Sequence, residues 1–301
     1  MARTGNPCED GLVLDFGWLS PVAGHAGSNF QPIVMYQEEH ILPVALAHFD
    51  SVWIADHFYG FDADKREGFL EGWTTLTWLA AKFPDVKLCH HVLGHGYRNP
   101  ALTAKMASTL QVLSGGRFML GIGGGWREDE YRSYGYEFPP ASVRLRQLEE
   151  VVQICRLMWT EPHPTFRGEH FAIDDAAATP RPDVVPPICI GAKGEQVALP
   201  IVGRRADMWN TGFGDDADWK RKRGIVDAAA EAFGRDPSAI ASCVTVAGEL
   251  PDSDDASEEW VERLAHLTEL GITHVVLDFG HPVSPEPALR FADQVIQPLK
   301  Q

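Results

Sequence analysis

The chain has 301 residues, of which 45% are hydrophobic and 23% charged, a composition typical of a globular protein with a sizeable core. Its formal net charge of −16 argues against nucleic acid and anionic membranes as partners, so a local cluster of donors must hold any anionic cofactor. No run is apolar enough for a signal core or a membrane span, and we expect a soluble, cytoplasmic protein. The five cysteines form no C-x-x-C pair and are expected to be buried free thiols.

Strands and helices are predicted to alternate along the chain after a disordered tail at residues 1–10. Apolar runs predict strands at 12–18, 51–55, 86–93, 118–122, 188–190, 207–209, 241–247 and 274–278. Helical periodicity predicts helices at 31–48, 72–83, 100–114, 142–159, 195–203, 215–233, 257–270 and 286–299. Residues 160–187 interrupt this rhythm with six prolines and are predicted to be a rim insertion containing a small hairpin at 165–173.

Eight strand–helix units predict an α/β fold, a single (β/α)₈ TIM barrel over residues 11–301. The alternative is a doubly wound sheet with a small second domain, which needs a switch point that the sequence does not offer. In a TIM barrel the working face is the C-terminal end of the strands. Glycine and tryptophan are frequent at these ends and carboxylates are few, which favours a large planar aromatic ligand over a hydrolytic metal.

The stretch 99–131 carries the most distinctive pattern. Asn99 is expected to cap a helix, and Gly115 and Gly116 to end it, because glycine adopts the left-handed conformation without a Cβ penalty. Four residues at helical spacing are expected to form its buried stripe: Leu102, Met106, Leu110 and Leu113. A strand then leads into Gly123–Trp126, where residues without side chains would let a flat ligand lie against bare backbone. The same loop could equally only turn a corner.

Asp56 and His57 follow directly after a predicted strand. A histidine beside a carboxylate at a strand end can exchange protons with a ligand near neutral pH, and a structural pair is the alternative. His90, His91 and His95 invite a metal interpretation. Adjacent strand residues point to opposite faces, however, so His90 and His91 cannot both line the barrel, and we expect no metal site.

The segment Gly191-Ala192-Lys193-Gly194 joins a strand to a helix. Its backbone N–H groups, the positive end of that helix and Lys193 would together form an anion site, although a plain helix start is equally consistent. Neither this segment nor the glycine loop matches a Walker A or dinucleotide fingerprint. Arg127 and Arg132, just beyond the glycine loop, could serve an anionic tail or only be solvated.

The chain resembles a known enzyme family in two runs, Tyr97-Arg-Asn-Pro-Ala-Leu102 and Leu113-Ser-Gly-Gly-Arg-Phe-Met-Leu-Gly-Ile-Gly-Gly-Gly-Trp-Arg-Glu-Asp-Glu-Tyr131. These runs resemble the signature of the luciferase-like flavin and deazaflavin oxidoreductases, with echoes at Phe166-Arg-Gly-Glu-His170 and Ala206-Asp-Met-Trp-Asn210. The resemblance spans about residues 12–280. It implies a luciferase-like TIM-barrel domain with an insertion, often a homodimer, that binds FMN or coenzyme F420 at the C-terminal strand ends.

The resemblance also assigns site residues. Ile54-Ala-Asp-His-Phe58 is similar to the S-D-H motif of the F420-using branch, which implies that Asp56 and His57 contact the deazaflavin ring. A cis peptide under the ring is implied at about Leu93 and Gly94. Further cofactor contacts are implied at Gly124, Gly125, Gly191 and Ala192, the last two on the phosphate side.

The substrate implied by the resemblance differs from that of one sub-branch, which oxidises glucose 6-phosphate. Trp126 stands where that sub-branch has a glutamate, and Asn210, Gly248 and Asp278 stand near the places of its basic residues. Trp126, Trp18 and the aromatic loop 58–73 suggest a small apolar or aromatic substrate instead.

The resulting hypothesis is an F420-dependent oxidoreductase that transfers a hydride between the deazaflavin and an organic substrate. His57 would move the accompanying proton, with Asp56 orienting it or contacting the cofactor. An FMN-dependent monooxygenase of the same family is one alternative. A non-catalytic barrel that binds a deazaflavin or another ligand is the other.

Overall fold

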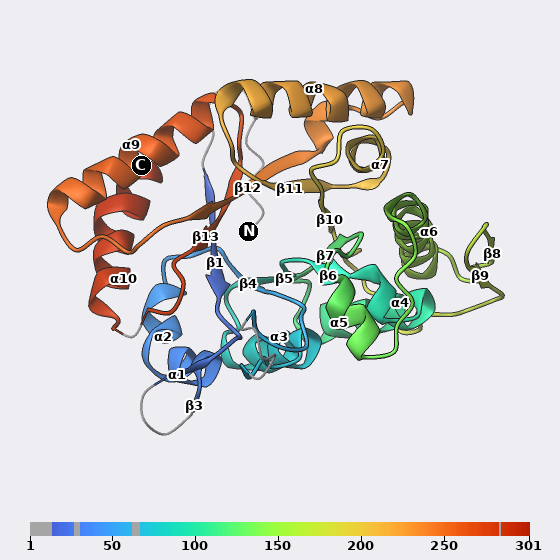
Figure 1. The fold of residues 1–301 in the computed structure, drawn as a ribbon, viewed down its shortest axis with the longest axis horizontal. Coiled ribbons are helices and arrows are strands. Elements are labelled where there is room, and N and C mark those ends of the chain that lie inside the picture. Colours follow the sequence, from blue (N-terminus) through green and yellow to red (C-terminus); the bar gives the residue numbers. More distant parts are fainter. Residues whose placement is uncertain (1–13, 27–30, 62–66, 283) are drawn as a thin grey trace.

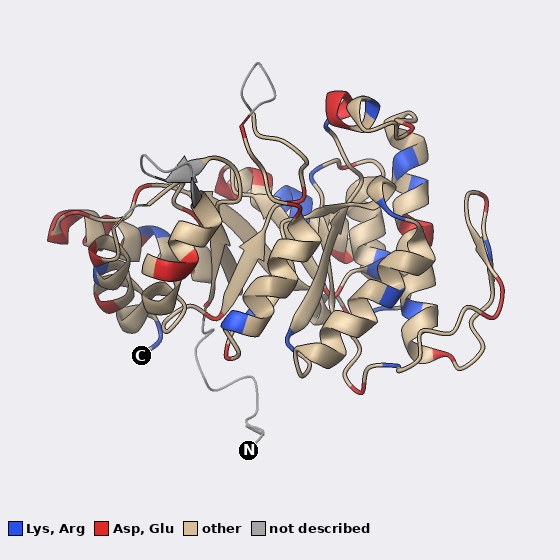
Figure 2. Cartoon of the chain, turned by 90° about the horizontal axis from the view of Figure 1, so that it is seen from below, with Lys and Arg blue, Asp and Glu red and all other residues tan. Residues whose placement is uncertain are grey.

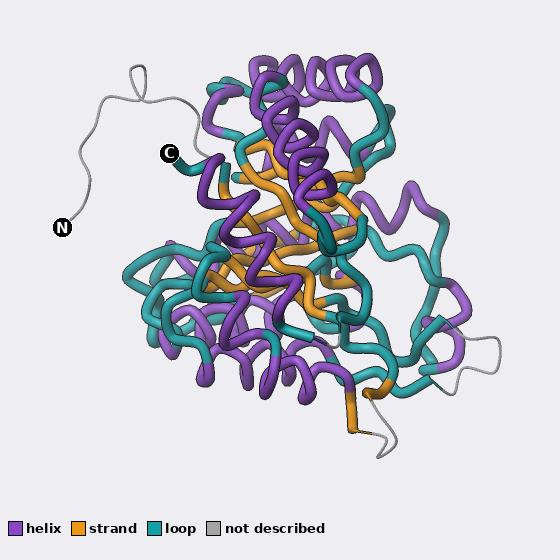
Figure 3. Tube along the Cα trace, turned by 90° about the vertical axis from the view of Figure 1, so that its left-hand side faces the viewer, coloured by secondary structure: helices purple, strands orange, loops and turns teal. Residues whose placement is uncertain are grey.

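A computed structural model describes residues 14–26, 31–61, 67–282 and 284–301 of the chain. Its centre is a closed barrel of eight parallel strands with helices outside it (Figures 1 and 3). The barrel strands are β1 (Asp15–Ser20), β4 (Ser51–Ile54), β5 (Lys87–His90), β7 (Phe118–Gly123), β10 (Ile188–Gly191), β11 (Met208–Gly212), β12 (Ala241–Ala247) and β13 (His274–Asp278). The barrel closes because β7 pairs with β5 on one side and with β10 on the other. The predicted TIM barrel is confirmed.

The helices lie along the outside of the barrel, most of them between successive strands and the last ones after β13. They are α1 (Ile33–His40), α2 (Leu42–Ala45), α3 (Gly72–Lys82), α4 (Pro100–Leu113), α5 (Glu128–Ser133), α6 (Ala141–Thr160), α7 (Ala198–Arg205), α8 (Asp216–Ala232), α9 (Asp254–Glu269), α10 (Glu286–Phe291) and α11 (Gln297–Leu299). Short helical turns are η1 (His95–Tyr97), η2 (Pro237–Ala239) and the π-helical η3 (Ala292–Ile296). The single helix predicted at 31–48 is divided into α1 and α2 at Ile41, and α5 was not predicted.

The predicted strand 86–93 is also divided, into β5 and the short strand β6 (Leu93–Gly94). Both pair with β7: Leu88 lies opposite Phe118, and Leu93 lies opposite Ile122. Five steps along one strand therefore match four along the other, which is the spacing of a one-residue bulge. This bulge lies at the end of the barrel where the glycine loop begins.

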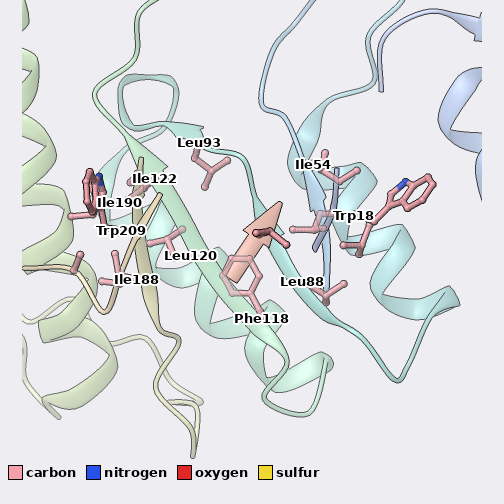
Figure 4. Packing of buried hydrophobic residues seen from close by; sticks show 14 of the residues in the cluster. Trp18, Ile54, Leu88, Leu93, Phe118, Leu120, Ile122, Ile188, Ile190 and Trp209 are labelled. Atoms are coloured by element: carbon pink, nitrogen blue, oxygen red, sulfur yellow. The ribbon is translucent and has the colours of Figure 1, made fainter. Parts of the chain in front are cut away.

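Two apolar layers result from the strand alternation. The inner layer fills the barrel mostly with sulfur-containing side chains, together with one tryptophan and one valine: Cys89, Met119, Cys189, Met208, Cys243, Trp53 and Val276. The outer layer faces the helices and includes Trp18, Ile54, Leu88, Phe118 and Trp209 (Figure 4). Cys89, Cys155, Cys189 and Cys243 are buried free thiols, as predicted, and Cys8 lies outside the described residues.

Helix α4 is capped as predicted, but the face that it buries differs from the predicted one. The Asn99 side chain accepts hydrogen bonds from the N–H groups at the helix start, and Gly115 and Gly116 follow its end with positive φ. The predicted stripe is half right: Leu110 is buried and Met106 packs against the core, but Leu102 is 52% and Leu113 73% exposed. The buried face is instead formed by Pro100, Thr103, Ala104, Ala107, Ser108, Leu110 and Gln111. These mostly small residues let α4 approach α6 closely enough for Trp159 to donate a hydrogen bond to the Ala104 carbonyl.

The rim insertion contains the predicted hairpin, formed by β8 (Phe166–Arg167) and β9 (Ala172–Ile173). It projects from the barrel beside α6 (Figures 1 and 2). The buried Glu150 carboxylate on α6 anchors it by accepting the backbone N–H groups of Glu169, His170 and Phe171. A second small hairpin pairs β2 (His25–Ala26) with β3 (Gln31–Pro32). Within the described part of the chain, no helix combines the length and apolar character needed to cross a membrane.

Candidate functional site

A cavity of about 680 Å³ opens at the C-terminal ends of the barrel strands. Its wall brings together residues from β5–β6, the glycine loop after β7, the segment after β10 and the end of β11. Every site residue predicted from the sequence except Trp18 lines it: Asp56, His57, Leu93, Gly94, Gly124, Gly125, Trp126, Gly191, Ala192 and Lys193. Its volume lies within the range typical of small-molecule and cofactor sites.

His57 lines this cavity and is held by a residue that the sequence reasoning missed. Its Nδ1 lies 2.8 Å from Oε2 of Glu130 on α5, and the Glu130 side chain is fully buried. Glu130 also accepts the Tyr97 hydroxyl at 2.6 Å and the Phe58 N–H at 2.6 Å. Burial opposes the charge, but the bonds from His57, Phe58 and Tyr97 outweigh it and lower the pKa of Glu130 below its ordinary value.

Asp56 is engaged elsewhere. Its carboxylate forms two hydrogen bonds with the Arg98 guanidinium, at 3.0 and 2.9 Å, and accepts the Gly94 N–H at 3.1 Å. Of the two roles predicted for Asp56, orienting His57 is wrong, because Glu130 occupies the Nδ1 position and Asp56 is bound to Arg98. Contact with the cofactor stays a prediction, since Asp56 lines the cavity. The carboxylate of Asp56 instead fixes β6, which forms part of the cavity wall.

His90 and His91 point to opposite faces, as predicted. His90 lies in the outer layer, with its ring 4.9 Å from that of Trp73, and burial lowers its pKa to about 3. His91 lines the cavity, with Nε2 2.8 Å from Oγ1 of Thr245, and burial lowers its pKa as well. The peptide bond between His91 and Val92 is cis, so the position predicted for it, about Leu93–Gly94, was two residues too late.

The glycine loop after β7 is shaped by side chains beneath it. Gly125 has a φ of +68°, and a Cβ there would overlap the buried Tyr131 hydroxyl. Above the loop, Arg144 at the start of α6 donates from Nε to the Gly124 carbonyl at 3.1 Å and lies 3.8 Å from the centre of the Phe138 ring. The loop is thus a fixed wall of bare backbone with a guanidinium at its edge.

Lys193 and Arg144 line this cavity and carry positive charge there. Lys193 is exposed, whereas the Arg144 guanidinium donates to the Gly124, Gly125 and Pro139 carbonyls. Neither takes part in an ion pair with any described carboxylate. The two arginines considered from the sequence are used otherwise: Arg127 donates to the Tyr59 and Gly60 carbonyls, and Arg132 pairs with Glu128. The place of Arg144 in the first turn of the helix after the glycine loop was the signal that could have identified it.

Trp126 is 66% exposed and lines the outer part of the cavity. Its ring is parallel to that of Phe61, with 6.3 Å between centres and 5° between planes. The His57 ring is nearly perpendicular to both, at 5.7 Å from Trp126 and 5.3 Å from Phe61. These three rings form an aromatic corner around the imidazole.

Trp18 does not belong to the site. It is 1% exposed and packs against Phe49 and Phe279, each 5.2 Å from its ring. Strand alternation explains the error: Leu19, the next residue of β1, packs against the inner layer, so Trp18 faces the helices (Figure 4). The prediction that it contacts substrate is wrong. Among the described residues, no group of three or more histidines, cysteines or carboxylates is arranged to hold a metal ion.

Residues 14–291 match the family model described as luciferase-like monooxygenase. The chain belongs to this family. Its sequence is 33% identical over 168 residues to the F420-dependent glucose-6-phosphate dehydrogenase of Amycolatopsis mediterranei, covering 54% of this chain and 48% of that protein. It is 32% identical over 184 residues to the pyrimidine monooxygenase RutA of Allorhizobium ampelinum, covering 59% of this chain and 50% of that protein.

The match thus spans about half the length of these curated relatives. The fold of this luciferase-like protein also matches a solved F420-dependent secondary alcohol dehydrogenase in complex with an F420-acetone adduct. That comparison has a TM-score of 0.81 at 20% identity and covers 96% of this chain and 99% of the other. It supports the barrel architecture over nearly the whole chain.

Proposed function

We propose that this luciferase-like protein is an F420-dependent oxidoreductase that acts on a small apolar or aromatic organic substrate. The observation that carries the proposal is the hydrogen bond between His57 and the buried Glu130 carboxylate at the edge of a large cavity walled by glycine backbone. This arrangement provides a proton-transfer group beside bare backbone, which suits a planar redox cofactor. The F420-dependent relative from Amycolatopsis supports the choice of cofactor.

The residues present fit such a cofactor. The cavity volume of about 680 Å³ is sufficient for a tricyclic ring with a polar chain, and Leu93, Gly94 and Gly124 offer it an apolar and unobstructed wall. Lys193 and Arg144 provide positive charge for a phosphate group, next to backbone at Gly191 and Ala192. These cations meet the requirement for a local donor cluster that the net charge of −16 imposes.

When bound, the deazaflavin supplies or accepts the hydride. The protein's part is to move the proton. Because Glu130 is a carboxylate and accepts only, Nδ1 of His57 carries the hydrogen of their shared bond. Nε2 is then the atom that takes a proton from an alcohol or, in the protonated ring, gives one to a carbonyl. Tyr97 and the Phe58 N–H hold Glu130 in place, so the tautomer of His57 is fixed.

The aromatic corner supports an apolar or aromatic substrate. Trp126 and Phe61 present large exposed ring surfaces within 6 Å of His57, and a flat apolar group can pack against them next to Nε2. The resemblance places Trp126 where the glucose-6-phosphate sub-branch has a glutamate. This difference favours an apolar substrate over the sugar phosphate for which the Amycolatopsis relative is named.

The proposal is tested by titrating the protein separately with F420 and FMN and following the quenching of its tryptophan fluorescence. We expect saturable binding of F420, and turnover of aromatic or apolar alcohols or carbonyls that falls about 10²–10⁴-fold in His57→Ala. Added imidazole should restore part of that loss, since it can occupy the vacated space. Binding of FMN alone, with oxygen consumption, would favour the monooxygenase alternative that RutA exemplifies. Binding without turnover on any substrate would favour a non-catalytic barrel.

We also propose that the protein is a homodimer that uses the exposed stripe of α4. Leu102, Met106 and Leu113 follow one face of this helix, and the two leucines are left uncovered. A second copy offers the same apolar stripe, and a symmetric pairing would bury both. Leu113→Lys should shift the protein to monomer in light-scattering measurements, whereas Leu289→Lys, at an exposed leucine of α10, should not. A wild-type protein that is monomeric at micromolar concentration would refute this arrangement.

A further inference from the structure

A second cavity, of about 400 Å³, lies outside the barrel between α6 and α7, on the side where β11 begins. It is enclosed by α6, α7, the hairpin strand β8 and the residue before β11. Nine residues line it: Val152, Gln153, Arg156, Leu157, Phe166, Arg204, Arg205, Asp207 and Arg235. Four of them are arginines and one is an acid, in a chain whose net charge is −16. Figure 2 shows basic segments along the helices beside the projecting hairpin.

Two carboxylates partly balance these arginines. Glu149 accepts from Arg204 at 3.0 and 2.8 Å and from Nε of Arg205 at 3.0 Å. Asp207 pairs with Nη2 of Arg156. The C-terminal end of α7 adds about half a negative charge. The cluster therefore remains positively charged.

The excess of positive charge around the second cavity affects Arg235. Its guanidinium donates to the Gly203 and Ala206 carbonyls at 2.8 and 2.6 Å and has no carboxylate partner among the described residues. Burial lowers its pKa, and the charges of Arg156 and Arg205 lower it further, although Asp207 acts in the opposite direction. Like charges are thus held together around an open space, where an anion would relieve their repulsion.

Several guanidinium nitrogens that belong to this cluster have no hydrogen-bond acceptor within the described ranges. They are Nε and Nη1 of Arg156, Nη1 and Nη2 of Arg205, and Nε of Arg235. Arg223, another arginine that binds backbone carbonyls, differs, because all three of its nitrogens are engaged with Asp227, Ser242 and the Pro237 and Ile240 carbonyls. The Arg223 guanidinium is thus fully engaged, whereas Arg156, Arg205 and Arg235 each keep N–H groups without an acceptor among the described residues. The Arg205 guanidinium also lies over the Phe233 ring, 4.8 Å from its centre.

We propose that the second cavity binds a small organic anion. A phosphate or carboxylate group would be held by the free N–H groups of Arg156, Arg205 and Arg235, because guanidinium groups match such oxygens in pairs. Leu157 and Phe166 provide an apolar wall for the rest of the molecule. This site is independent of the proposed redox chemistry.

The binding site is tested with inorganic pyrophosphate and citrate, which separate phosphate from carboxylate recognition. We expect a saturable rise in melting temperature with at least one of them, at constant ionic strength maintained with sodium chloride. Arg205→Gln should weaken that anion's apparent affinity at least tenfold by calorimetry. Arg205 is chosen because Arg204 still holds Glu149 in its absence.

Two control variants test whether the anion binds at the second cavity. Lys193→Gln alters the first cavity only, and Arg223→Gln removes a satisfied arginine, so both should keep the affinity of the wild type. The proposal is overturned if neither anion gives a saturable response, if Arg205→Gln binds as tightly as the wild type, or if Lys193→Gln abolishes binding. The last result would place the anion at the first cavity.

Discussion

Replacing His90 with phenylalanine is expected to remove its own part of the pH dependence of stability below neutral pH. His91 and His95, whose pKa values burial also lowers, contribute the same way and remain in the variant. The His90 ring lies 4.9 Å from Trp73 and 5.9 Å from Phe118. Neither ring nitrogen has a hydrogen-bond partner among the described residues. Burial, with a further contribution from the Arg98 charge, lowers the pKa of His90 to about 3 from an ordinary value of 6.5. Phenylalanine has nearly the same shape and no proton to bind.

The sign and size of the effect follow from linkage. The unfolded chain binds a proton at His90 below about pH 6.5, whereas the folded chain resists it until about pH 3. The contribution of His90 to stability is therefore complete above pH 6.5 and is lost as the pH falls toward 3. Between pH 7 and 5 this loss amounts to about 2 kcal/mol, which His90→Phe should not show.

Urea unfolding at pH 7, 6 and 5, followed by tryptophan fluorescence, measures the difference. His163→Phe is the matched control, because that histidine side chain is 80% exposed and its replacement should leave the wild-type pH dependence nearly unchanged. The reasoning would be refuted if the free energy of unfolding fell equally in the wild type and in His90→Phe between pH 7 and 5. His90 would then be protonated or solvated in the folded state.

Four further predictions concern the barrel and the site. Gly121→Ala should destabilise the fold by about 3 kcal/mol or more in urea unfolding, because a Cβ would overlap the His90 carbonyl of the neighbouring strand. Gly224→Ala, in open space on α8, should stabilise it by about 0.5–1 kcal/mol. Glu130→Gln should lower kcat at least tenfold with little change in KM, because it removes the carboxylate that fixes the imidazole tautomer; an unchanged kcat would contradict this role. Trp126→Glu should weaken the binding of an apolar substrate, and unchanged affinity in a fluorescence titration would remove Trp126 from the substrate site.

The barrel could be predicted from the sequence because its signals are local. Each strand is a short apolar run and each helix has its own period, cap or glycine end, as Asn99 and Gly115 illustrate on α4. The strand ends then follow from the fold class, and most of the predicted site residues do line one cavity. The face to which a side chain points depends on where its strand begins and ends in the sheet. Trp18 and Leu19 are adjacent in β1 and point to opposite faces. Leu19 faces the inside of the barrel, so Trp18 lies in the outer layer.

The packing of α4 shows a second limit. Its large residues have helical spacing, but so do its small ones, and periodicity alone does not say which face meets the barrel. Close approach to α6 selected the small face, with Ala104 beneath the Trp159 indole. Leu102 and Leu113 were consequently left outside.

The partner of His57 could not have been found from sequence neighbours. Asp56 is adjacent in the chain, yet the carboxylate at Nδ1 belongs to Glu130, 73 residues away. What brings them together is the order of strands: β4 and β7 are separated only by β5, so the loops after them meet above it. Asp56, in turn, is drawn to Arg98 by charge. Contacts between the loops therefore decide which of the two acids, Asp56 or Glu130, bonds to His57. An acid at the start of a helix that follows a glycine loop is as strong a candidate partner as an acid next to the histidine.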